Sequence, residues 1–178
     1  MAEQAEEIRL RQISPDDKVR GFFLGDKDFP QRYVPLTIFL QKDAKKHHKE
    51  NVSKTYVAIS EKKILGYISL SCSVIVLDTP PVGLDTYKYK SYPAVKIGKL
   101  AVDTHYRQRD LGSKLVSLAV ATVKDNVMPN VGCRFIVVDS HQDAIEFYKK
   151  QGFLLLETEE NKARPDPVMF LDIGKLSG

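Results

Sequence analysis

The segment from Val95 to Phe153 places the strongest constraint on how this chain can fold, and a basic turn lies in its middle. The run Val95–Val102 is rich in β-branched and aliphatic residues, which predicts a strand. After the turn Tyr106–Ser113, helical spacing links Leu111, Leu115, Leu118, Ala119 and Thr122. Such a junction presents unpaired N–H groups and the positive end of a helix dipole, here with two arginines beside a glycine. The turn is therefore predicted to bind an anion, and we expect a phosphate.

Two motifs in this segment resemble those of the GNAT superfamily of N-acetyltransferases. The pyrophosphate-binding turn of that family has Gln or Arg, two residues, Gly, one residue, then Gly or Ala, and the pattern falls here on Arg107 to Gly112. Asp110 stands where the first glycine is usual, which puts a carboxylate near a diphosphate. The second motif follows a strand at Arg134–Val138. It is the segment Asp143–Phe153, which resembles the family's helix with a Phe-Tyr pair that ends in Gly-Phe.

The resemblance implies an α/β (α+β) fold with one mixed, mostly antiparallel sheet of about seven strands and helices on both faces. Alternation, turn formers and helical spacing predict a matching order of elements. The predicted strands are Glu7–Ile13, Lys54–Ile59, Ile64–Leu77, Val95–Val102, Arg134–Val138, Phe153–Leu156 and Val168–Ile173. The predicted helices run from Ser14 toward Phe22, from Pro35 to about Lys49, from the turn to about Asn126, and from Asp143 to Gln151.

The resemblance also implies acetyl-CoA as the co-substrate. Backbone groups near the end of the fourth strand would pair with the pantetheine like an added strand, and the turn would hold the diphosphate with its N–H groups and arginines. The cofactor-binding residues predicted in this way are Leu100, Ala101, Val102, Arg107, Gln108, Arg109, Asp110, Leu111, Gly112 and Ser113.

Tyr148 is the predicted catalytic residue. In the family, the tyrosine at this position donates a proton to the departing CoA thiolate, which suits a phenol in a dry site. Phe147 next to it can fill the core instead. The sequence assigns no general base, because neither Asp103 nor Glu146 has a supporting spacing, and solvent can take the proton of the attacking amine.

A further resemblance is to the GNAT toxins of bacterial toxin-antitoxin pairs. It lies in Ala94–Asp103 before the turn, and in Val131–Arg134 with Val137–Asp139 after it. Those toxins acetylate the amino group of the amino acid on charged tRNA and are neutralised by a small ribbon-helix-helix antitoxin. The resemblance thus implies aminoacyl-tRNA as the acceptor and such an antitoxin as a partner, and it leaves a homodimer open.

Two other functions remain open from the sequence. Metabolite and protein N-acetyltransferases share much of the same frame, so a general primary-amine acceptor is one alternative. The other is a non-catalytic CoA-binding or partner-binding domain in which Asp110 has weakened cofactor affinity.

Length and composition predict one soluble, cytoplasmic domain over residues 1–178. A chain of 178 residues with 43% hydrophobic and 28% charged residues can bury a sizeable single core. It has no apolar run of membrane-spanning length, and the acidic start at Met1–Glu7 is unlike a signal peptide. Cys72 and Cys133 are expected to be buried free thiols, with neither a disulfide nor a metal site.

Two basic stretches offer candidate contacts with an anionic macromolecule, and the net charge of +4 is compatible with one. The first is the end of the second predicted helix. It contains Lys42, Lys45, Lys46, His47, His48 and Lys49, which suit either a solvated helix end or the binding of a polyanion, and the histidines are assigned no role. In the second, Tyr87, Tyr89 and Tyr92 interleave with Lys88 and Lys90, which suits either nucleic-acid stacking or an edge of the fold.

Overall fold

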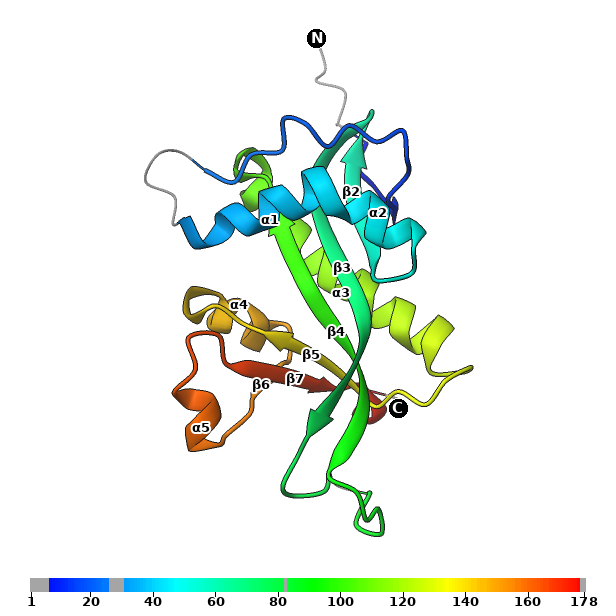
Figure 1. Ribbon diagram of the computed structural model, residues 1–178, viewed down its shortest axis with the longest axis vertical. Helices are drawn as coiled ribbons and strands as arrows, with labels where there is room; N and C mark the ends of the chain where they lie inside the picture. Colours follow the sequence, from blue (N-terminus) through cyan, green and yellow to red (C-terminus); the bar gives the residue numbers. More distant parts are fainter. Residues whose placement is uncertain (1–6, 26–30, 82, 177–178) are drawn as a thin grey trace. The chain divides into compact units, whose positions relative to one another are not determined.

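The computed structural model describes residues 7–25, 31–81 and 83–176, apart from the side chain of Arg32. Seven strands form one sheet in the order β1-β2-β3-β4-β5-β7-β6 (Figure 1). They are β1 (Arg9–Gln12), β2 (Lys54–Ser60), β3 (Lys63–Val76), β4 (Ser91–Val102), β5 (Phe135–Asp139), β6 (Leu154–Leu155) and β7 (Val168–Asp172). Strands β4 and β5 pair in parallel, while β1-β2, β2-β3, β5-β7 and β6-β7 are antiparallel. The predicted mixed, mostly antiparallel α/β fold is confirmed.

The chain forms two units, each with its own hydrophobic core. Unit 1 comprises residues 1–71 and 98–119, and unit 2 comprises residues 72–97 and 120–178. Strands β3 and β4 contribute to both. The assignment of residues 1–178 to a single domain stays a prediction.

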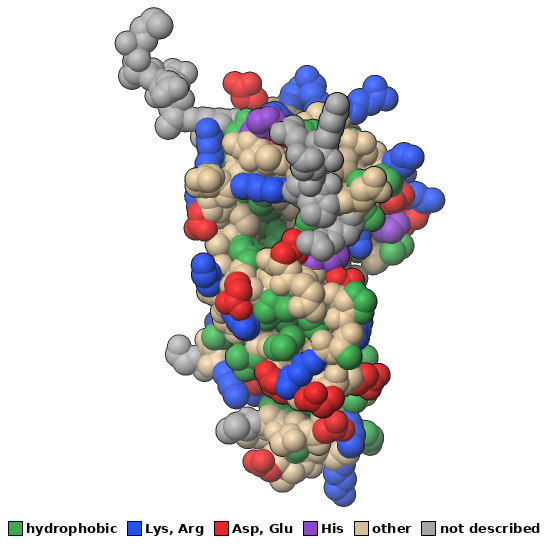
Figure 2. All heavy atoms as spheres, turned by 90° about the vertical axis from the view of Figure 1, so that its left-hand side faces the viewer, with side chains coloured by type: hydrophobic (Ala, Val, Ile, Leu, Met, Phe, Trp, Pro, Cys, Tyr) green, Lys and Arg blue, Asp and Glu red, His purple; other side chains and the backbone are tan. Residues whose placement is uncertain are grey.

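Charge is distributed unequally between the two units. The sequence of unit 1 has 17 Lys and Arg against 12 Asp and Glu, whereas that of unit 2 has 10 against 11. The net charge of +4 therefore comes entirely from unit 1. On the face shown in Figure 2, basic and acidic side chains are interspersed with hydrophobic ones.

The cysteines differ from the prediction. Cys72 is exposed and Cys133 is half-buried, and both are free. Cys72 lies in the part of β3 where side chains alternate between half-buried and exposed, so the apolar context in the sequence did not make it a core residue. Among the described residues, no helix is long and apolar enough to cross a membrane, and no group of three or more potential metal ligands occurs.

Unit 2 is built around β5. Strand β7 pairs with it in an antiparallel arrangement in which Val137 lies opposite Phe170. Side chains on one face of this pair form a core with β3 and β4, made of Ile75, Leu77, Tyr92, Ala94, Phe135 and Val137. The helix α4 (Ile145–Lys150) follows β5, as the sequence predicts. A short helix, α5 (Glu159–Lys162), lies between β6 and β7, and Thr158 caps it by accepting a hydrogen bond from the N–H of Asn161.

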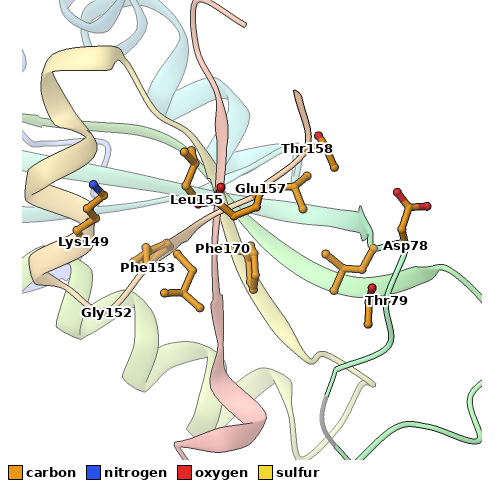
Figure 3. Close-up of a pocket in the computed structure, with 12 residues that line it drawn as sticks. Asp78, Thr79, Lys149, Gly152, Phe153, Leu155, Glu157, Thr158 and Phe170 are labelled. Carbon is orange, nitrogen blue, oxygen red and sulfur yellow. The ribbon is translucent and has the colours of Figure 1, made fainter. Parts of the chain in front are cut away.

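A pocket of about 750 Å³ lies in unit 2, between the end of α4, strands β6 and β7, and the segment that follows β3 (Figure 3). Its floor is mainly apolar and includes Phe153 and Phe170, while Asp78, Lys149 and Glu157 stand at its rim. Each of these three charges is already paired, with Lys90, Glu146 and Lys162 respectively. The pocket is therefore mainly apolar, and the charged side chains at its edge are paired with side chains of opposite charge.

Unit 1 contains the helical segment predicted from Pro35 to Lys49. It consists of α1 (Val34–Ile38), a π-helical turn (Phe39–Asp43) and α2 (Ala44–Lys49). Pro35 lies in the first turn of α1, where a missing N–H group costs nothing. Phe39, Leu40 and Ala44 of this segment are buried.

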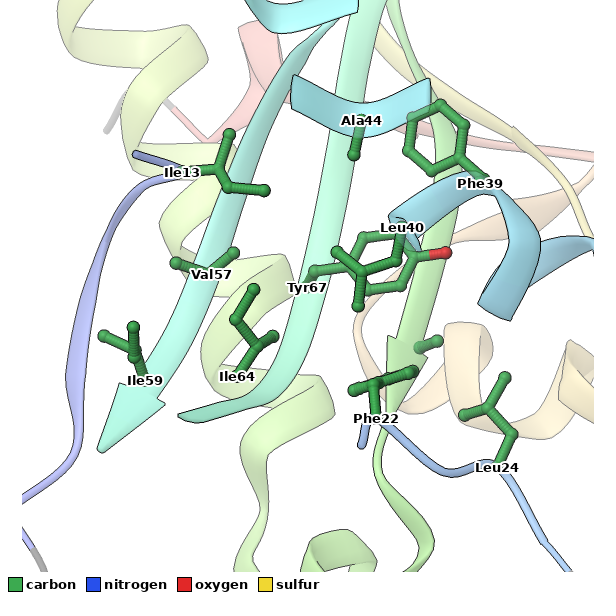
Figure 4. Close-up of a cluster of buried hydrophobic side chains, with 11 residues drawn as sticks. Ile13, Phe22, Leu24, Phe39, Leu40, Ala44, Val57, Ile59, Ile64 and Tyr67 are labelled. Atoms are coloured by element: carbon green, nitrogen blue, oxygen red, sulfur yellow. The ribbon is translucent and has the colours of Figure 1, made fainter. Parts of the chain in front are cut away.

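Helices cover both faces of β3 within unit 1. Val57 of β2 lies opposite Tyr67 of β3, and both face the core that Phe39, Leu40 and Ala44 complete (Figure 4). The Tyr67 hydroxyl donates a 2.7 Å hydrogen bond to the carbonyl of Leu36, so the ring also anchors α1. On the other face of β3, α3 (Leu111–Thr122) approaches Gly66, where an added Cβ would lie 3.1 Å from a methyl group of Leu115 and 3.2 Å from the carbonyl oxygen of Ala101.

The helix predicted from Ser14 toward Phe22 is wrong. The Asp17 carboxylate accepts hydrogen bonds from the Ser14 N–H and from the Arg11 guanidinium, which folds this segment into a turn. Lys45 holds the turn from α2 by donating to the carbonyls of Pro15 and Asp17, each at 2.6 Å. Strand β1 is also exposed along its length, whereas its alternating pattern predicts a half-buried strand.

Candidate functional site

The segment that leads into the predicted anion turn begins at Asp103, directly after β4. This carboxylate is fully buried and caps the 3-10 helix Thr104–Arg109 by accepting a 3.0 Å hydrogen bond from the N–H of His105. The ring Nδ1 of His105 lies 2.8 Å from the same oxygen, and the second oxygen accepts a 2.9 Å bond from the N–H of Phe23. The start of the turn is therefore fixed by a buried, fully hydrogen-bonded carboxylate.

Asp110 ends the 3-10 helix in a left-handed conformation, with φ 57° and ψ 22°. Left-handed backbone favours glycine, and aspartate tolerates it better than most other residues do. This conformation explains why the family pattern has a glycine at this position and how Asp110 substitutes for it. The Asp110 side chain is exposed, and α3 begins at the next residue, Leu111.

All ten predicted cofactor-binding residues lie in unit 1. In β4, Ala101 is buried and Leu100 and Val102 are half-buried; in the turn, Arg107, Gln108, Arg109 and Asp110 are exposed, Leu111 is buried, and Gly112 and Ser113 are half-buried. The register of β4 with β5 runs from Ala94 to Ile97, so Gly98–Val102 follows that paired stretch. The structure thus brings together the strand end, the turn and the first turn of a twelve-residue helix.

The two arginines of the turn are differently placed. Arg107 donates a 2.9 Å hydrogen bond to the carbonyl of Leu24, and the guanidinium of Arg109 lies 4.9 Å from the centre of the Tyr106 ring. Both guanidinium groups are fixed beside the N-terminus of α3, whose dipole favours an anion. The binding of a diphosphate by these residues stays a prediction.

The segment Phe22–Gly25 supports the turn, and sequence analysis missed this role. Phe23 makes two hydrogen bonds with the turn residues: its N–H donates to the side-chain carboxylate of Asp103, and its carbonyl accepts a 2.8 Å bond from the N–H of Thr104. Its ring also packs against His105, with centroids 5.7 Å apart. No local pattern could reveal contacts between residues 80 positions apart in the sequence.

Tyr148 lies in α4, in unit 2, and is 5% exposed. Its ring packs edge-on against Phe147 at 5.1 Å and against Phe153 at 5.4 Å. Burial raises the pKa of the Tyr148 phenol above its ordinary value, so the hydroxyl keeps its proton at neutral pH. This protonation state is the one a proton donor requires.

Neither carboxylate left open by the sequence offers a free base. Asp103 has three hydrogen-bond contacts and no exposed surface, as described above. Glu146 is exposed and pairs with Lys149 at 2.8 Å, one helical turn away. Neither of these two carboxylates is therefore assigned as the general base.

The basic end of α2 is only partly available to a ligand. Lys45 is used to hold the Asp17 turn, and His48 Nδ1 accepts a 3.1 Å hydrogen bond from the N–H of Thr55. Burial, with a smaller contribution from Lys54, lowers the pKa of His48, so this ring is neutral. The His47 ring packs against Phe39 at 5.6 Å. The exposed cations of the segment are Lys42, Lys46 and Lys49.

The chain is similar to known acetyltransferases. A curated tRNA-acetylating toxin of Mycobacterium tuberculosis is 25% identical over 150 residues, which cover 84% of this chain and 86% of the relative. The structure of AtaT complexed with acetyl-methionyl-tRNAfMet shares the fold, with a TM-score of 0.79, 21% identity, and coverage of 96% of this chain and 97% of that chain. So does a tyrosine-to-phenylalanine mutant of the AtaT toxin bound to the C-terminus of the antitoxin AtaR, with a TM-score of 0.74, 22% identity, and coverage of 96% and 95%.

A sequence model described as the Acetyltransferase (GNAT) family matches residues 16–153, which is more than half of the chain. This range contains both motifs from which the resemblance was drawn, the turn Arg107–Gly112 and the segment Asp143–Phe153. The predicted family, type of enzyme and co-substrate are therefore confirmed. The chain belongs to the acetyltransferase (GNAT) family and is an acetyl-CoA-dependent N-acetyltransferase.

Proposed function

We propose that this enzyme acetylates the α-amino group of aminoacyl-tRNA and acts as a toxin in the cytoplasm. The observation that carries this proposal is the similarity to a tRNA-acetylating toxin over 84% of the chain. The charge distribution supports it, because unit 1 holds the candidate cofactor turn and all of the net positive charge. A charged tRNA is a polyanion that also carries a free α-amine.

The proposed cofactor site runs from the end of β4 to the start of α3. Backbone groups of Leu100, Ala101 and Val102 would pair with the pantetheine as an added strand. Arg107 and Arg109, with the N–H groups of residues 107–113, would hold the diphosphate through charge-assisted hydrogen bonds. When bound, acetyl-CoA supplies the acetyl thioester to be attacked by the amine.

Tyr148 is the proposed general acid. Its hydroxyl holds a proton at neutral pH, as an ordinary tyrosine does, and burial raises the pKa of the phenol further. Donation of that proton to the departing sulfur would prevent a thiolate from building up in a site without water. The rings of Phe147 and Phe153 fix the orientation of the phenol.

Substitutions at Asp110 will separate its charge from its backbone conformation. Asp110→Asn removes the charge but keeps a residue that tolerates φ 57°, and Asp110→Gly removes both the charge and the strain. We expect both variants to bind CoA about two- to fivefold more tightly in calorimetry, because an exposed carboxylate near a diphosphate costs up to about 1 kcal/mol.

Asp110→Ala is the control, since alanine lacks the charge but is strained in this conformation. It should bind CoA less tightly than Asp110→Asn. Equal affinity of Asp110→Asn and the wild type would mean that the carboxylate faces away from the phosphates.

The acceptor will be identified by incubating the enzyme with labelled acetyl-CoA and separate acceptors. These are total aminoacyl-tRNA, deacylated tRNA, polyamines, free amino acids and a lysine-containing protein. We expect label to enter aminoacyl-tRNA only, because deacylated tRNA lacks the α-amine and the small amines lack the phosphate backbone. Label in a polyamine or a protein lysine would refute the toxin proposal and leave a general N-acetyltransferase. Absence of label in all arms would favour a CoA-binding domain without catalysis.

The exposed lysines of the α2 segment should contribute to tRNA affinity through phosphate contacts. Replacing Lys42, Lys46 and Lys49 together by alanine should lower the slope of log affinity against log salt by about 2 to 3. The same three positions changed to arginine keep the charge and should keep the slope. CoA affinity should be unchanged in both variants. Lys45 is left intact because it holds the Asp17 turn.

The proposed function also includes an antitoxin as a partner protein and a homodimer. The structure of AtaT bound to the C-terminus of AtaR shows an antitoxin on a chain of similar fold. We expect a ribbon-helix-helix antitoxin for this chain, so that expression without the partner slows bacterial growth and co-expression restores it. A homodimer stays a prediction, to be measured by light scattering.

A further inference from the structure

Five aromatic rings form a continuous ladder in unit 2, from the surface to the core. Successive ring centroids are 5.5 Å apart between Tyr89 and Tyr87, 5.1 Å between Tyr87 and Tyr92, 5.8 Å between Tyr92 and Phe135, and 5.9 Å between Phe135 and Phe170. Tyr92 is 2% exposed, and Phe135, the first residue of β5, is 1% exposed. The outer rings are therefore held by an aromatic column that is anchored in the core.

The outer end of the ladder offers aromatic surface to solvent. Tyr89 is 71% exposed and Tyr87 is 41% exposed. Their planes are inclined by 63°, an edge-to-face arrangement that does not bury both faces of the Tyr89 ring. A large aromatic side chain with this much exposure contributes little to folding, and its ring is available to stack with a ligand that has a flat face.

Basic side chains alternate with these tyrosines. Lys88 lies between Tyr87 and Tyr89 and is exposed, and Lys90 follows and pairs with Asp78 at 2.9 Å. Exposed rings interleaved with ammonium groups match the chemistry of an unpaired nucleotide, in which a base can stack and the adjoining phosphate can accept a charge-assisted hydrogen bond. Tyr92 and Phe135 hold the outer rings in place. Less conformational entropy of these side chains is therefore lost when a base stacks on them.

We propose that Tyr87, Lys88 and Tyr89 form a stacking platform for unpaired nucleotides of the RNA acceptor. This proposal rests on the proposed function, since it assumes that the acceptor is an RNA. Tyr89 takes the base on its free face, Tyr87 holds the Tyr89 ring in place, and Lys88 pairs with a phosphate. Such stacking tolerates any base sequence, because every base has a π-face.

Binding of a fluorescein-labelled single-stranded RNA octamer, measured by anisotropy, tests the platform directly. Tyr89→Ala should weaken binding about 5- to 100-fold, whereas Tyr89→Phe should bind like the wild type because it keeps the ring. Val76→Ala is the matched control, since Val76 is 55% exposed at the end of β3 and has no ring. Thermal unfolding should be the same for all four proteins, because the Tyr89 side chain is mostly in solvent.

Salt dependence separates stacking from charge. Lys88→Ala should lower the slope of log affinity against log salt by about 1, while Tyr89→Ala should lower the affinity and leave the slope unchanged. A blunt-ended RNA duplex, which has no unpaired nucleotide, should bind the wild type and Tyr89→Ala equally. Loss of duplex binding together with octamer binding would instead indicate a general anionic site and would overturn the platform.

Acetylation kinetics distinguish failure of the platform from failure of the proposed function. If both are right, Tyr89→Ala raises the KM for aminoacyl-tRNA and leaves CoA affinity unchanged. If aminoacyl-tRNA is acetylated but neither its KM nor octamer binding changes in Tyr89→Ala, the platform is wrong and the proposed function stands. If aminoacyl-tRNA is not acetylated, the proposed function fails, and the octamer result still decides whether the platform binds RNA. A surface that meets a protein partner instead would leave octamer binding unchanged in Tyr89→Ala.

Discussion

Replacing Tyr148 by phenylalanine is expected to lower turnover about 100- to 10,000-fold, which is the range contributed by a positioned general acid. Affinity for CoA should be unchanged, because the hydroxyl is needed only when the sulfur departs. The contacts of the ring with Phe147 and Phe153 remain in this variant, so its stability should change little. Turnover is measured by release of the CoA thiol, and affinity is measured by calorimetry.

Tyr67→Phe is the matched control, because burial raises the pKa of Tyr67 strongly as well. Its hydroxyl donates to the carbonyl of Leu36, so this variant should lose about 1 kcal/mol of stability and keep its turnover. Wild-type turnover should also not fall as the pH approaches the ordinary tyrosine pKa of about 10, because burial keeps Tyr148 protonated there. Full turnover in Tyr148→Phe would show that the proton comes from water.

Replacing Asp103 by alanine is expected to destabilise the protein by about 2 to 4 kcal/mol, because an N-cap is lost and the N–H groups of Phe23 and His105 lose their acceptor. For a chain of this length, the melting temperature should fall by roughly 5 to 15 °C. The turn that follows loses its fixed start, so CoA affinity should fall as well. Thermal unfolding and calorimetry measure the two effects.

The conservative variant Asp103→Asn should lie between alanine and the wild type. One amide oxygen can still accept from His105, but the NH₂ group would face the N–H of Phe23. Asp16→Ala, which changes an exposed carboxylate in the same unit, should alter neither stability nor CoA affinity. An Asp103→Ala variant that melts like the wild type would mean that Phe22–Gly25 does not hold the turn.

Local patterns were sufficient for most of the fold. The strand that ends at Val102, the basic turn and the helix from Leu111 each depend on spacing within a few residues, and all three were predicted correctly. The helical segment ending at Lys49 was predicted for the same reason. The cofactor and catalytic roles of Leu100–Ser113 and of Tyr148 stay predictions, which the variants above test.

Elements stabilised by distant side chains were not predictable from local patterns. Ser14 and Pro15 have the sequence of a helix start, but the charge of Asp17 is taken up by Arg11 of β1, and Lys45 of α2 ties the same turn. Cys72 lies in an apolar run but alternates to the exposed side of β3. Contacts with Lys45, which is remote in sequence, decided that Ser14 and Pro15 lie in a turn. The side of β3 on which Cys72 lies decided its exposure.

The sequence by itself determined the family and the order of the seven strands along the chain, because both depend on residue types at short, fixed spacings. The tertiary structure decided which groups are buried and what holds them. Phe23 reaches Asp103 across 80 residues, and the aromatic ladder joins Tyr89 to Phe170 across 81 positions through three intervening rings. Burial and the pairing of buried polar groups depend on contacts between residues this far apart in the sequence. Burial raises the pKa of the Tyr148 phenol, and the hydrogen bonds of Asp103 hold the start of the predicted anion turn.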